Sequence, residues 1–329
     1  MGISYKESGV DIAAGEETVN RIKPLVKSTH NESVLSDIGL FGGFFEVNFK
    51  DYEHPVMVAS TDGVGTKLKV AFATERHDTI GQCLVNHCVN DILACGAKPL
   101  FFLDYFATGK LKPDVTEQVI KGFTVACKEN GVALIGGETA EMPSMYLDGE
   151  YDVSGTIVGI VEKSKIVNGE NIRKGDLMIG LASSGLHTNG YSLARAALFP
   201  KYSPDTYFDE LGETLGTALL AVHKSYFRTV FPLIEDKKLN GISHITGGGI
   251  EGNTKRILRD GLKMNIDWNS WQLPAIFKLI QNEANISDAE MRSAFNLGIG
   301  MILIIDHSNL ELVMNQCKAH NPILIGRIE

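Results

Sequence analysis

The feature that most constrains the fold is an irregular alternation of short apolar runs and amphipathic stretches on both sides of one polar segment. Apolar runs such as Val56–Ala59 and Ile299–Ile305 are typical of buried strands. Residues 78–96 and 114–129 have the spacing of helices. Strands and helices interleave, but not as a strict repeat of strand, helix and strand. We therefore predict an α+β fold rather than a doubly wound parallel sheet.

A change of composition divides the chain. Residues 163–175 are rich in Lys, Asn, Glu and Gly, whereas the flanking regions carry apolar strands. The length of 329 residues suggests two domains, at about 150 residues per domain. We therefore predict an N-terminal domain over residues 1–168 and a C-terminal domain over residues 169–329.

Charge and hydropathy exclude several classes of function. The chain has 31 Lys and Arg against 40 Asp and Glu, a net charge of −9, whereas binding to nucleic acid generally needs a basic face. No apolar run reaches the roughly 18 residues of a membrane span, so no membrane partner is expected. The N-terminus lacks the apolar segment of a signal peptide. Five cysteines without a C-x-x-C pair are typical of reduced thiols, so we expect a cytoplasmic protein.

Residues 60–67 read STDGVGTK and directly follow an apolar run. Glycines let a turn approach a ligand closely and expose backbone N–H groups. Lys67 can neutralise a phosphate, Thr66 can donate a hydroxyl, and the Asp62 carboxylate can hold Mg²⁺. The segment is not a Walker A loop, because G-x-x-x-x-G-K-[ST] does not occur. A strand-to-helix turn capped by Asp62 explains the segment equally well.

Two acidic segments follow. Asp91 comes four residues after His87 in a predicted helix, so both lie on one side of it; taken alone, this pair is more typical of a solvated helix. Residues 136–143 read GGETAEMP and place Glu138 and Glu141 after a glycine pair at the end of a predicted buried strand. Ligand-binding loops gather at strand ends, so this second segment favours a functional role.

Two polar segments of the second half precede predicted helices. Residues 183–190 read SSGLHTNG and can bind an anion at a helix N-terminus. Residues 244–249 read HITGGG, and three glycines cost enough folding entropy to suggest a close approach of the backbone to a ligand. Capping and turn formation remain the alternative for both. Together the segments suggest a Mg²⁺–nucleotide site, a second anionic substrate and phosphoryl transfer.

At these segments the sequence resembles the phosphoribosylformylglycinamidine cyclo-ligases, which are the aminoimidazole ribonucleotide synthetases of purine biosynthesis. The resemblance runs nearly end to end and rests on YKESGVDIAAGEE, STDGVGTKLK, VNDILACGAKPLFFLDYFATGK, GGETAEMP, LASSGLHTNGYSL, HITGGGIEGN and FNLGIGM. The chain departs from the family in three places. Ser144 stands where Gly is usual, Thr188 replaces a frequent Ser, and GNTKRIL replaces a common Asn-Ile-Pro-Arg pattern.

The resemblance implies a two-domain α+β fold of the aminoimidazole ribonucleotide synthetase superfamily. Its N-terminal mixed sheet with helices would bind ATP and Mg²⁺ and pair across a homodimer, with Leu100–Phe106 as a candidate contact. Its C-terminal α/β layered domain would bind substrate and phosphate. The implied reaction converts formylglycinamidine ribonucleotide and ATP to aminoimidazole ribonucleotide, ADP and phosphate. The formyl amide oxygen would be phosphorylated, and the amidine nitrogen would then close the ring.

The resemblance also implies roles for individual residues. The expected Mg²⁺ ligands are Asp62, Asp91 and Glu138. These three are also expected in catalysis, together with Lys67 and with His187, whose imidazole titrates near neutral pH. The residues expected to bind ATP or phosphate are Lys6, Asp11, Gly63, Gly65, Thr66, Lys67, Thr246, Gly247, Gly248 and Gly249. The residues expected at the substrate are Glu141, Ser184, His187 and Asn189.

Two points stay open at the level of sequence. The residues do not indicate which Gly-rich loop holds ATP and which holds the ribonucleotide phosphate. A related ATP-dependent kinase or synthetase with another acceptor, or a non-catalytic nucleotide-binding protein, would also retain much of this pattern.

Overall fold

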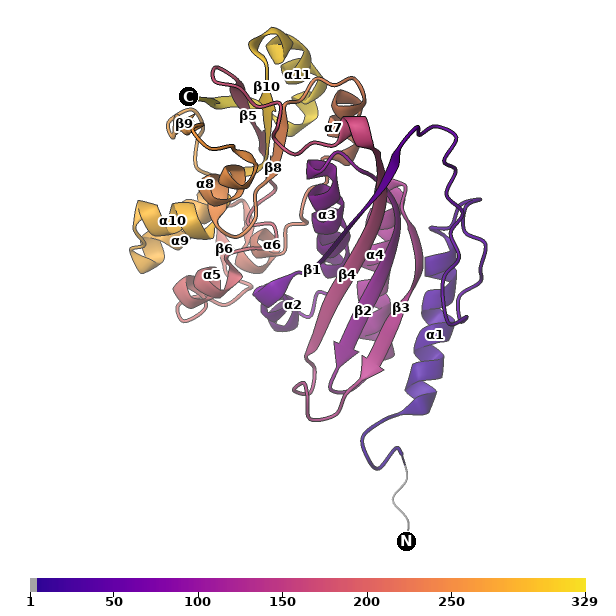
Figure 1. Cartoon of the computed structure of the whole chain (residues 1–329). Coiled ribbons are helices and arrows are strands. Elements are labelled where there is room, and N and C mark those ends of the chain that lie inside the picture. Colours follow the sequence, from indigo (N-terminus) through magenta and orange to yellow (C-terminus); the bar gives the residue numbers. More distant parts are fainter. Residues whose placement is uncertain (1–4) are drawn as a thin grey trace.

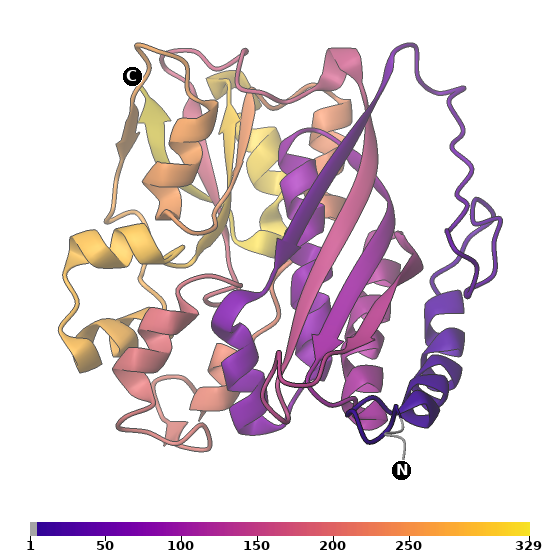
Figure 2. The ribbon, with the colours of Figure 1, turned by 60° about the horizontal axis from the view of Figure 1, so that its bottom comes forward.

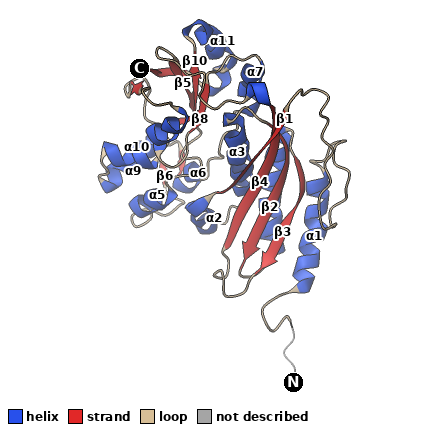
Figure 3. Ribbon diagram, viewed as in Figure 1, coloured by secondary structure: helices blue, strands red, loops and turns tan. Residues whose placement is uncertain are grey.

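The computed structural model describes residues 5–329, and its strands form two main sheets, one in each half of the chain (Figures 1 and 3). The first sheet has four strands in the order β1-β4-β2-β3. Strand β4 runs antiparallel to β1 and β2, whereas β2 and β3 are parallel, so the predicted mixed sheet is confirmed. The strands are β1 (Pro55–Gly63), β2 (Lys98–Thr108), β3 (Ala133–Glu141) and β4 (Tyr151–Glu162).

Helices cover one face of this first sheet. Helices α3 (Asp78–Ala94) and α4 (Pro113–Asn130) lie behind it in Figures 1 and 2, and α1 (Ile12–Lys27) packs against α4. The two covering helices approach closely because glycines meet at their contact. A Cβ atom on Gly81 would lie 2.3 Å from the carbonyl oxygen of Val119. The other face of the sheet carries no helix within residues 5–329.

Strand β2 shows how its aromatic residues divide between the two faces. Phe102 and Phe106 are fully buried against the helices, whereas Tyr105 on the open face is 38% exposed. Successive side chains of a strand point to opposite faces, so only alternate residues of Leu100–Phe106 are available for a contact with a second copy.

The second sheet is antiparallel throughout, in the order β8-β10-β5-β11-β9. Every residue of β10 is buried, which accounts for its continuous apolar run. One face packs against α7 and α11 and the other against α8, so helices and sheet form layers. The elements are β5 (Leu177–Ala182), β8 (Gly241–His244), β9 (Met264–Ile266), β10 (Ile299–Ile305), β11 (Ile323–Ile328), α7 (Phe227–Glu235), α8 (Gly249–Thr254) and α11 (Leu310–Gln316).

Shorter elements complete the fold. They are α2 (Leu68–Thr74), α5 (Tyr191–Leu198), α6 (Leu215–Leu219), α9 (Ala275–Ala284), α10 (Asp288–Ala294) and the small strands β6 (Tyr207–Phe208) and β7 (Glu213–Thr214). The sequence pattern predicts one helix over residues 214–238, but residues 220–226 leave the helical path between α6 and α7. That break carries His223 and Tyr226 into the interior.

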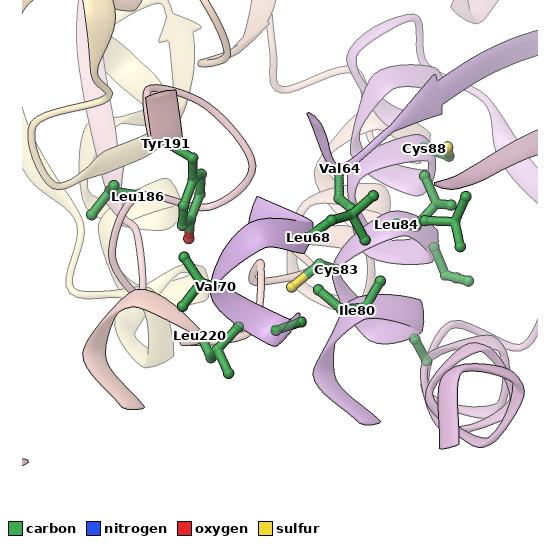
Figure 4. Close-up of a cluster of buried hydrophobic side chains, with 14 of the residues drawn as sticks. Val64, Leu68, Val70, Ile80, Cys83, Leu84, Cys88, Leu186, Tyr191 and Leu220 are labelled. Atoms are coloured by element: carbon green, nitrogen blue, oxygen red, sulfur yellow. The ribbon is translucent and has the colours of Figure 1, made fainter. Parts of the chain in front are cut away.

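One hydrophobic core crosses the boundary between the halves. In Figure 4, Val64 and Leu68 of the N-terminal half gather with Leu186, Tyr191 and Leu220 of the C-terminal half. All five are buried. Apolar packing therefore fixes the end of β1 against the loop at residues 183–190. None of the helices in residues 5–329 has both the length and the apolar character needed to cross a lipid bilayer.

Candidate active site

Polar side chains converge where α3 meets the ends of β1 and β8. Asp62 lies near the end of β1, Asp91 lies on α3, and His244 ends β8. Four histidines gather there and all are buried: His87, His187, His223 and His244. We call these four histidines together with Asp62 and Asp91 the interdomain cluster, because both halves of the chain contribute to it.

Imidazoles hold the two carboxylates of the cluster in place. His87 Nε2 lies 2.9 Å from Asp62 Oδ2 and 3.7 Å from Asp91 Oδ2. His244 Nδ1 lies 2.8 Å from Asp91 Oδ1, and the Ser60 hydroxyl donates to Asp91 Oδ2 at 3.0 Å. Asp62 and Asp91 thus both contact His87, from two different elements.

The charges of the cluster follow from these contacts. Burial by itself raises the pKa of Asp62 and Asp91, but hydrogen bonds from His87 and His244 outweigh burial and hold both pKa values below their ordinary range. Burial acts to lower the pKa of His87, and its bond to Asp62 overcomes this and raises the pKa. The two carboxylates are therefore anionic and suited to a divalent cation.

Lys67 lies in the shared core rather than at the surface of its loop. Its side chain is fully buried, and Nζ donates to the carbonyl oxygens of Ala221 at 2.6 Å and His187 at 3.0 Å. Nζ also lies 3.1 Å from Cys83 Sγ. In this arrangement the ammonium ties the two halves together, and a phosphate would reach it only after the side chain moved.

The rest of the segment at residues 60–67 makes a tight turn. The Gly63 N–H donates to Asp62 Oδ1 at 2.7 Å, and Gly65 has a left-handed φ of +55°. The Thr66 hydroxyl lies 2.8 Å from the Ser192 hydroxyl at the start of α5. Local turn geometry and contact between the two halves thus account for these residues, and their role in binding ATP stays a prediction.

His187 differs from the sequence-based expectation. It is 1% exposed, and its ring stacks on His223 with centroids 4.0 Å apart. Burial, together with the positive potential of His244 and Lys67, lowers the pKa of His187 well below its ordinary value. The expectation of titration near neutral pH is therefore wrong for this conformation, because a buried imidazole surrounded by other bases stays neutral.

The two Gly-rich segments of the C-terminal half meet beside the cluster. A Cβ atom on Gly247 would lie 3.2 Å from Asn189 Oδ1. The N–H groups of Gly248 and Gly249 donate to the carbonyl oxygens of Ser293 and Thr246, both at 3.1 Å. A Cβ atom on Gly249 would also lie 1.8 Å from a carbonyl oxygen of α10. Packing rather than ligand approach therefore explains Gly249, and the phosphate role of Thr246–Gly249 stays a prediction.

The acidic segment on β3 lies elsewhere. Asp62 and Glu138 belong to the two outer strands of the four-stranded sheet, and three strand spacings separate those strands by about 14 Å. Within one chain, Glu138 therefore cannot share a metal ion with Asp62, and a site with all three expected carboxylates would need Glu138 from a second copy. The cause is the strand order, which the sequence does not reveal.

The N-terminal arm gathers at the β3 side of the sheet. Lys6 Nζ pairs with Asp11 Oδ2 at 2.8 Å, and the Asp11 N–H donates to Glu141 Oε2 at 2.6 Å. Glu141 Oε1 accepts from the Leu111 N–H at 2.8 Å. Lys6, Asp11 and Glu141 border a cavity of about 500 Å³ that also includes Lys110. Glu138 lines a neighbouring hollow together with Asp11 and Glu141, so these residues lie apart from the interdomain cluster.

Sequence reasoning missed His223 altogether. Its neighbours predict part of a helix, and no local motif surrounds it. In the fold its Nε2 lies 3.1 Å from His244 Nε2, and its Nδ1 lies 3.4 Å from the Thr188 hydroxyl. Only the break between α6 and α7 brings it there.

Comparison with known proteins decides the family. Residues 48–161 match the family described as AIR synthase related protein, N-terminal domain, and residues 173–329 match the corresponding C-terminal domain. Phosphoribosylformylglycinamidine cyclo-ligase of Alkaliphilus metalliredigens is 51% identical over 314 residues, covering 95% of this chain and 90% of that protein. This chain belongs to the phosphoribosylformylglycinamidine cyclo-ligase family. It is accordingly an ATP-dependent cyclo-ligase of purine biosynthesis.

Further relatives agree over the whole length. The cyclo-ligase of Thermodesulfovibrio yellowstonii is 49% identical and covers 99% of this chain and 96% of that protein. Among solved structures, thiamine-monophosphate kinase from Stenotrophomonas maltophilia has a TM-score of 0.69 at 17% identity, covering 95% of this chain and 93% of that one. Hydrogenase maturation protein HypE in complex with ATP has a TM-score of 0.68 at 16% identity, covering 98% and 87%. These two likenesses concern the fold alone.

Proposed function

We propose that the interdomain cluster is the place where the cyclo-ligase binds Mg²⁺ and the phosphates of ATP, with Asp62 and Asp91 as the metal ligands. The observation that carries the proposal is that these two anionic carboxylates lie 2.9 Å and 3.7 Å from the same His87 nitrogen. Oxygen donors are what Mg²⁺ prefers, so the residues fit the ion. When bound, Mg²⁺ supplies positive charge that neutralises phosphate oxygens.

The reaction needs an activated carbonyl. An amide carbonyl is a poor electrophile, because resonance holds the C–N bond and the oxygen leaves poorly. Transfer of the γ-phosphoryl group of ATP to the formyl oxygen of formylglycinamidine ribonucleotide releases ADP and forms a phosphate ester. The substrate's amidine nitrogen then attacks the same carbon, the carbon–oxygen bond to phosphate breaks, and the nitrogen loses a proton. The tethered nucleophile has an effective concentration on the order of 10⁵ M.

The residues of this chain would position the reactants and exclude water. His87 and His244 hold the carboxylates in fixed orientations through the bonds described above. Ser184 is exposed and Asn189 is half-buried, so both can contact a substrate without rearrangement. His187 would contact substrate only if the loop at residues 183–190 opened. Water exclusion matters because hydrolysis of the phosphorylated amide would waste ATP.

We also infer that the chain forms a homodimer through the open face of the four-stranded sheet. Met57 and Tyr105 on that face are 48% and 38% exposed. The segment before β1 adds further exposed apolar side chains, at Leu35, Leu40, Phe41, Phe44 and Phe49. Apolar surface of this extent is typical of an interface. A second copy is also the only source from which Glu138 can join Asp62 at one site.

The reaction itself is tested with purified protein, Mg²⁺–ATP and formylglycinamidine ribonucleotide, with both phosphate and aminoimidazole product measured. One phosphate per imidazole, and only with both substrates present, is the expected result. Phosphate without imidazole would mean that activation is uncoupled from ring closure. If the protein still binds ATP but forms neither phosphate nor imidazole, the assignment is contradicted. Other phosphoryl acceptors should then be tested.

The shared site is tested by mixing two inactive variants. Asp62→Asn and Glu138→Gln are each expected to lose activity. If one site draws Asp62 and Glu138 from different copies, unfolding and refolding the two variants together regenerates sites with both carboxylates. Mixed preparations should then recover about a quarter of wild-type activity, given random pairing and two sites per dimer. No recovery from a mixture that forms dimers would refute the shared site.

A further inference from the structure

The interdomain cluster is richer in imidazole than a magnesium site requires. We propose that His87, Asp91 and His244 form a binding site for a divalent first-row transition-metal ion, with Zn²⁺ as the expected occupant. One ligand atom from each of these three residues lies within 4.8 Å of the others. Two imidazoles and one carboxylate are a recognised ligand set for such ions and leave further coordination positions open.

The hydrogen bonds around His223 fix where its proton lies. The Asn90 side-chain oxygen accepts from the Tyr226 N–H at 3.1 Å, and its amide nitrogen donates to the Lys224 carbonyl oxygen at 2.9 Å. The same amide nitrogen lies 3.2 Å from His223 Nε2. Since an amide NH₂ can only donate, His223 Nε2 must be an acceptor, and the proton of a neutral His223 lies on Nδ1.

His244 then lacks a satisfactory neutral form. Its Nε2 lies 3.1 Å from the acceptor His223 Nε2, and its Nδ1 lies 2.8 Å from the Asp91 carboxylate. A neutral ring carries only one N–H. If the His244 proton is on Nδ1, the Nε2 atoms of His244 and His223 face each other with no hydrogen between them. If it is on Nε2, the lone pair of His244 Nδ1 faces the Asp91 carboxylate. Neither neutral form of His244 therefore satisfies both of these contacts.

A metal ion between Asp91 and the two imidazoles satisfies these contacts. With the ion on His244 Nδ1, the Nε2–H of His244 can donate to His223 Nε2. With the ion on His87 Nε2, the Nδ1–H of His87 can donate to the Thr188 hydroxyl, which lies 2.6 Å away. Imidazoles that bind metals normally donate their second N–H to such a partner. Both partners are already in place here.

The chemistry of the ligands distinguishes such an ion from Mg²⁺. Imidazole nitrogen suits Zn²⁺ and its neighbours, whereas Mg²⁺ favours oxygen ligands and retains water. Asp62 Oδ2 is 2.9 Å from His87 Nε2 but is not one of the residues whose ligand atoms lie within 4.8 Å of one another, so the ligand set is His87, Asp91 and His244. One consequence rests on the proposed function: because Asp91 serves both ions, Zn²⁺ would compete with Mg²⁺–ATP and inhibit the cyclo-ligase. Metal binding itself does not depend on that assignment.

The site is tested by titrating the full-length protein, freed of metal with a chelator, with Co²⁺ in the absence of nucleotide. The exposed thiol of Cys95 is removed with Cys95→Ser in every sample, because thiolates also bind these ions. We expect one Co²⁺ per chain with visible ligand-field absorption. His87→Gln should weaken binding at least tenfold, whereas His54→Gln, the same change at an exposed histidine, should not alter it. Equal binding by the two variants would overturn the proposal.

A second measurement needs no variant in the cluster. X-ray absorption of the Zn²⁺-loaded protein should show imidazole nitrogen and carboxylate oxygen around the ion. Sulfur neighbours, oxygen neighbours alone, or no bound Zn²⁺ after dialysis would refute the site and leave a doubly protonated His244 as the form that satisfies the cluster. Because neither measurement uses ATP or substrate, a failure of the proposed catalytic roles would leave both results unchanged.

Discussion

Asp104 offers the sharpest test of the energetics of the N-terminal sheet. It lies on β2 between Phe102 and Phe106, and by the alternation of the strand it points with them toward the helices. Its carboxylate packs against Gly137, where a Cβ atom would lie 2.1 Å from Oδ1. Burial raises the pKa of Asp104 from 3.8 to about 7. The folded chain therefore keeps this acid protonated over a pH range in which the unfolded chain ionises it.

The size of the effect follows from proton linkage. Between about pH 4 and pH 7 the native state binds one more proton than the unfolded state, so the free energy of unfolding falls as pH rises. A shift of about 3 pKa units corresponds to about 4 kcal/mol. Asp104→Asn has the shape of the protonated acid and cannot ionise. The variant should therefore match wild type near pH 4 and be more stable by up to about 4 kcal/mol above pH 8.

The assay is urea unfolding followed by far-UV circular dichroism at pH 5, 6, 7 and 8. Tryptophan fluorescence would not serve, because Trp268 and Trp271 both lie in the C-terminal half. Asp209→Asn, the same change at an exposed site, is the control and should alter stability by less than about 0.5 kcal/mol at every pH. A stability difference for Asp104→Asn that does not grow with pH would refute the argument.

Three further outcomes are expected. Asp91→Asn should lose at least about 100-fold in Mg²⁺-dependent turnover while keeping its near-UV circular dichroism, and normal kinetics would remove Asp91 from the site. Ser144 has a left-handed φ of +71°, so Ser144→Gly should raise the free energy of unfolding by about 0.5–1 kcal/mol in urea titrations; a decrease would show that the strain is absent. Gly249→Ala should cost about 3 kcal/mol, because its Cβ would meet the Arg292 carbonyl oxygen at 1.8 Å, and unchanged thermal unfolding would contradict that close contact.

Long periodic elements were predictable from the sequence. The pattern over 78–96 predicts α3 (Asp78–Ala94), and the run at 151–162 predicts β4 with the same bounds. Such elements follow from local periodicity and from breakers such as Pro99. Segments whose conformation depends on distant partners were not predictable. Residues 44–49 predict a strand but form only a single bridge, between Val34 and Phe45, and Phe45 packs its ring on Phe101 of β2 instead of extending either sheet.

Within the interdomain cluster the sequence indicated most of the residues but not that they meet. Asp62 lies in a segment that is notable by itself, whereas Asp91 was expected as a metal ligand only through the family resemblance, and the fold brings both to His87. His223 has no motif, and its place depends on a break in helical structure that is stabilised by tertiary contacts such as the bond from the Tyr226 N–H to Asn90.

The sequence by itself determined the α+β class, the loops that carry polar chemistry and the family resemblance, because these depend on residue type and spacing along the chain. Only the tertiary structure decided which of those loops meet. The order β1-β4-β2-β3 separates Asp62 from Glu138, and the shared apolar core buries Lys67 and His187. Strand order and burial arise from pairings between residues far apart in sequence, which no local pattern encodes.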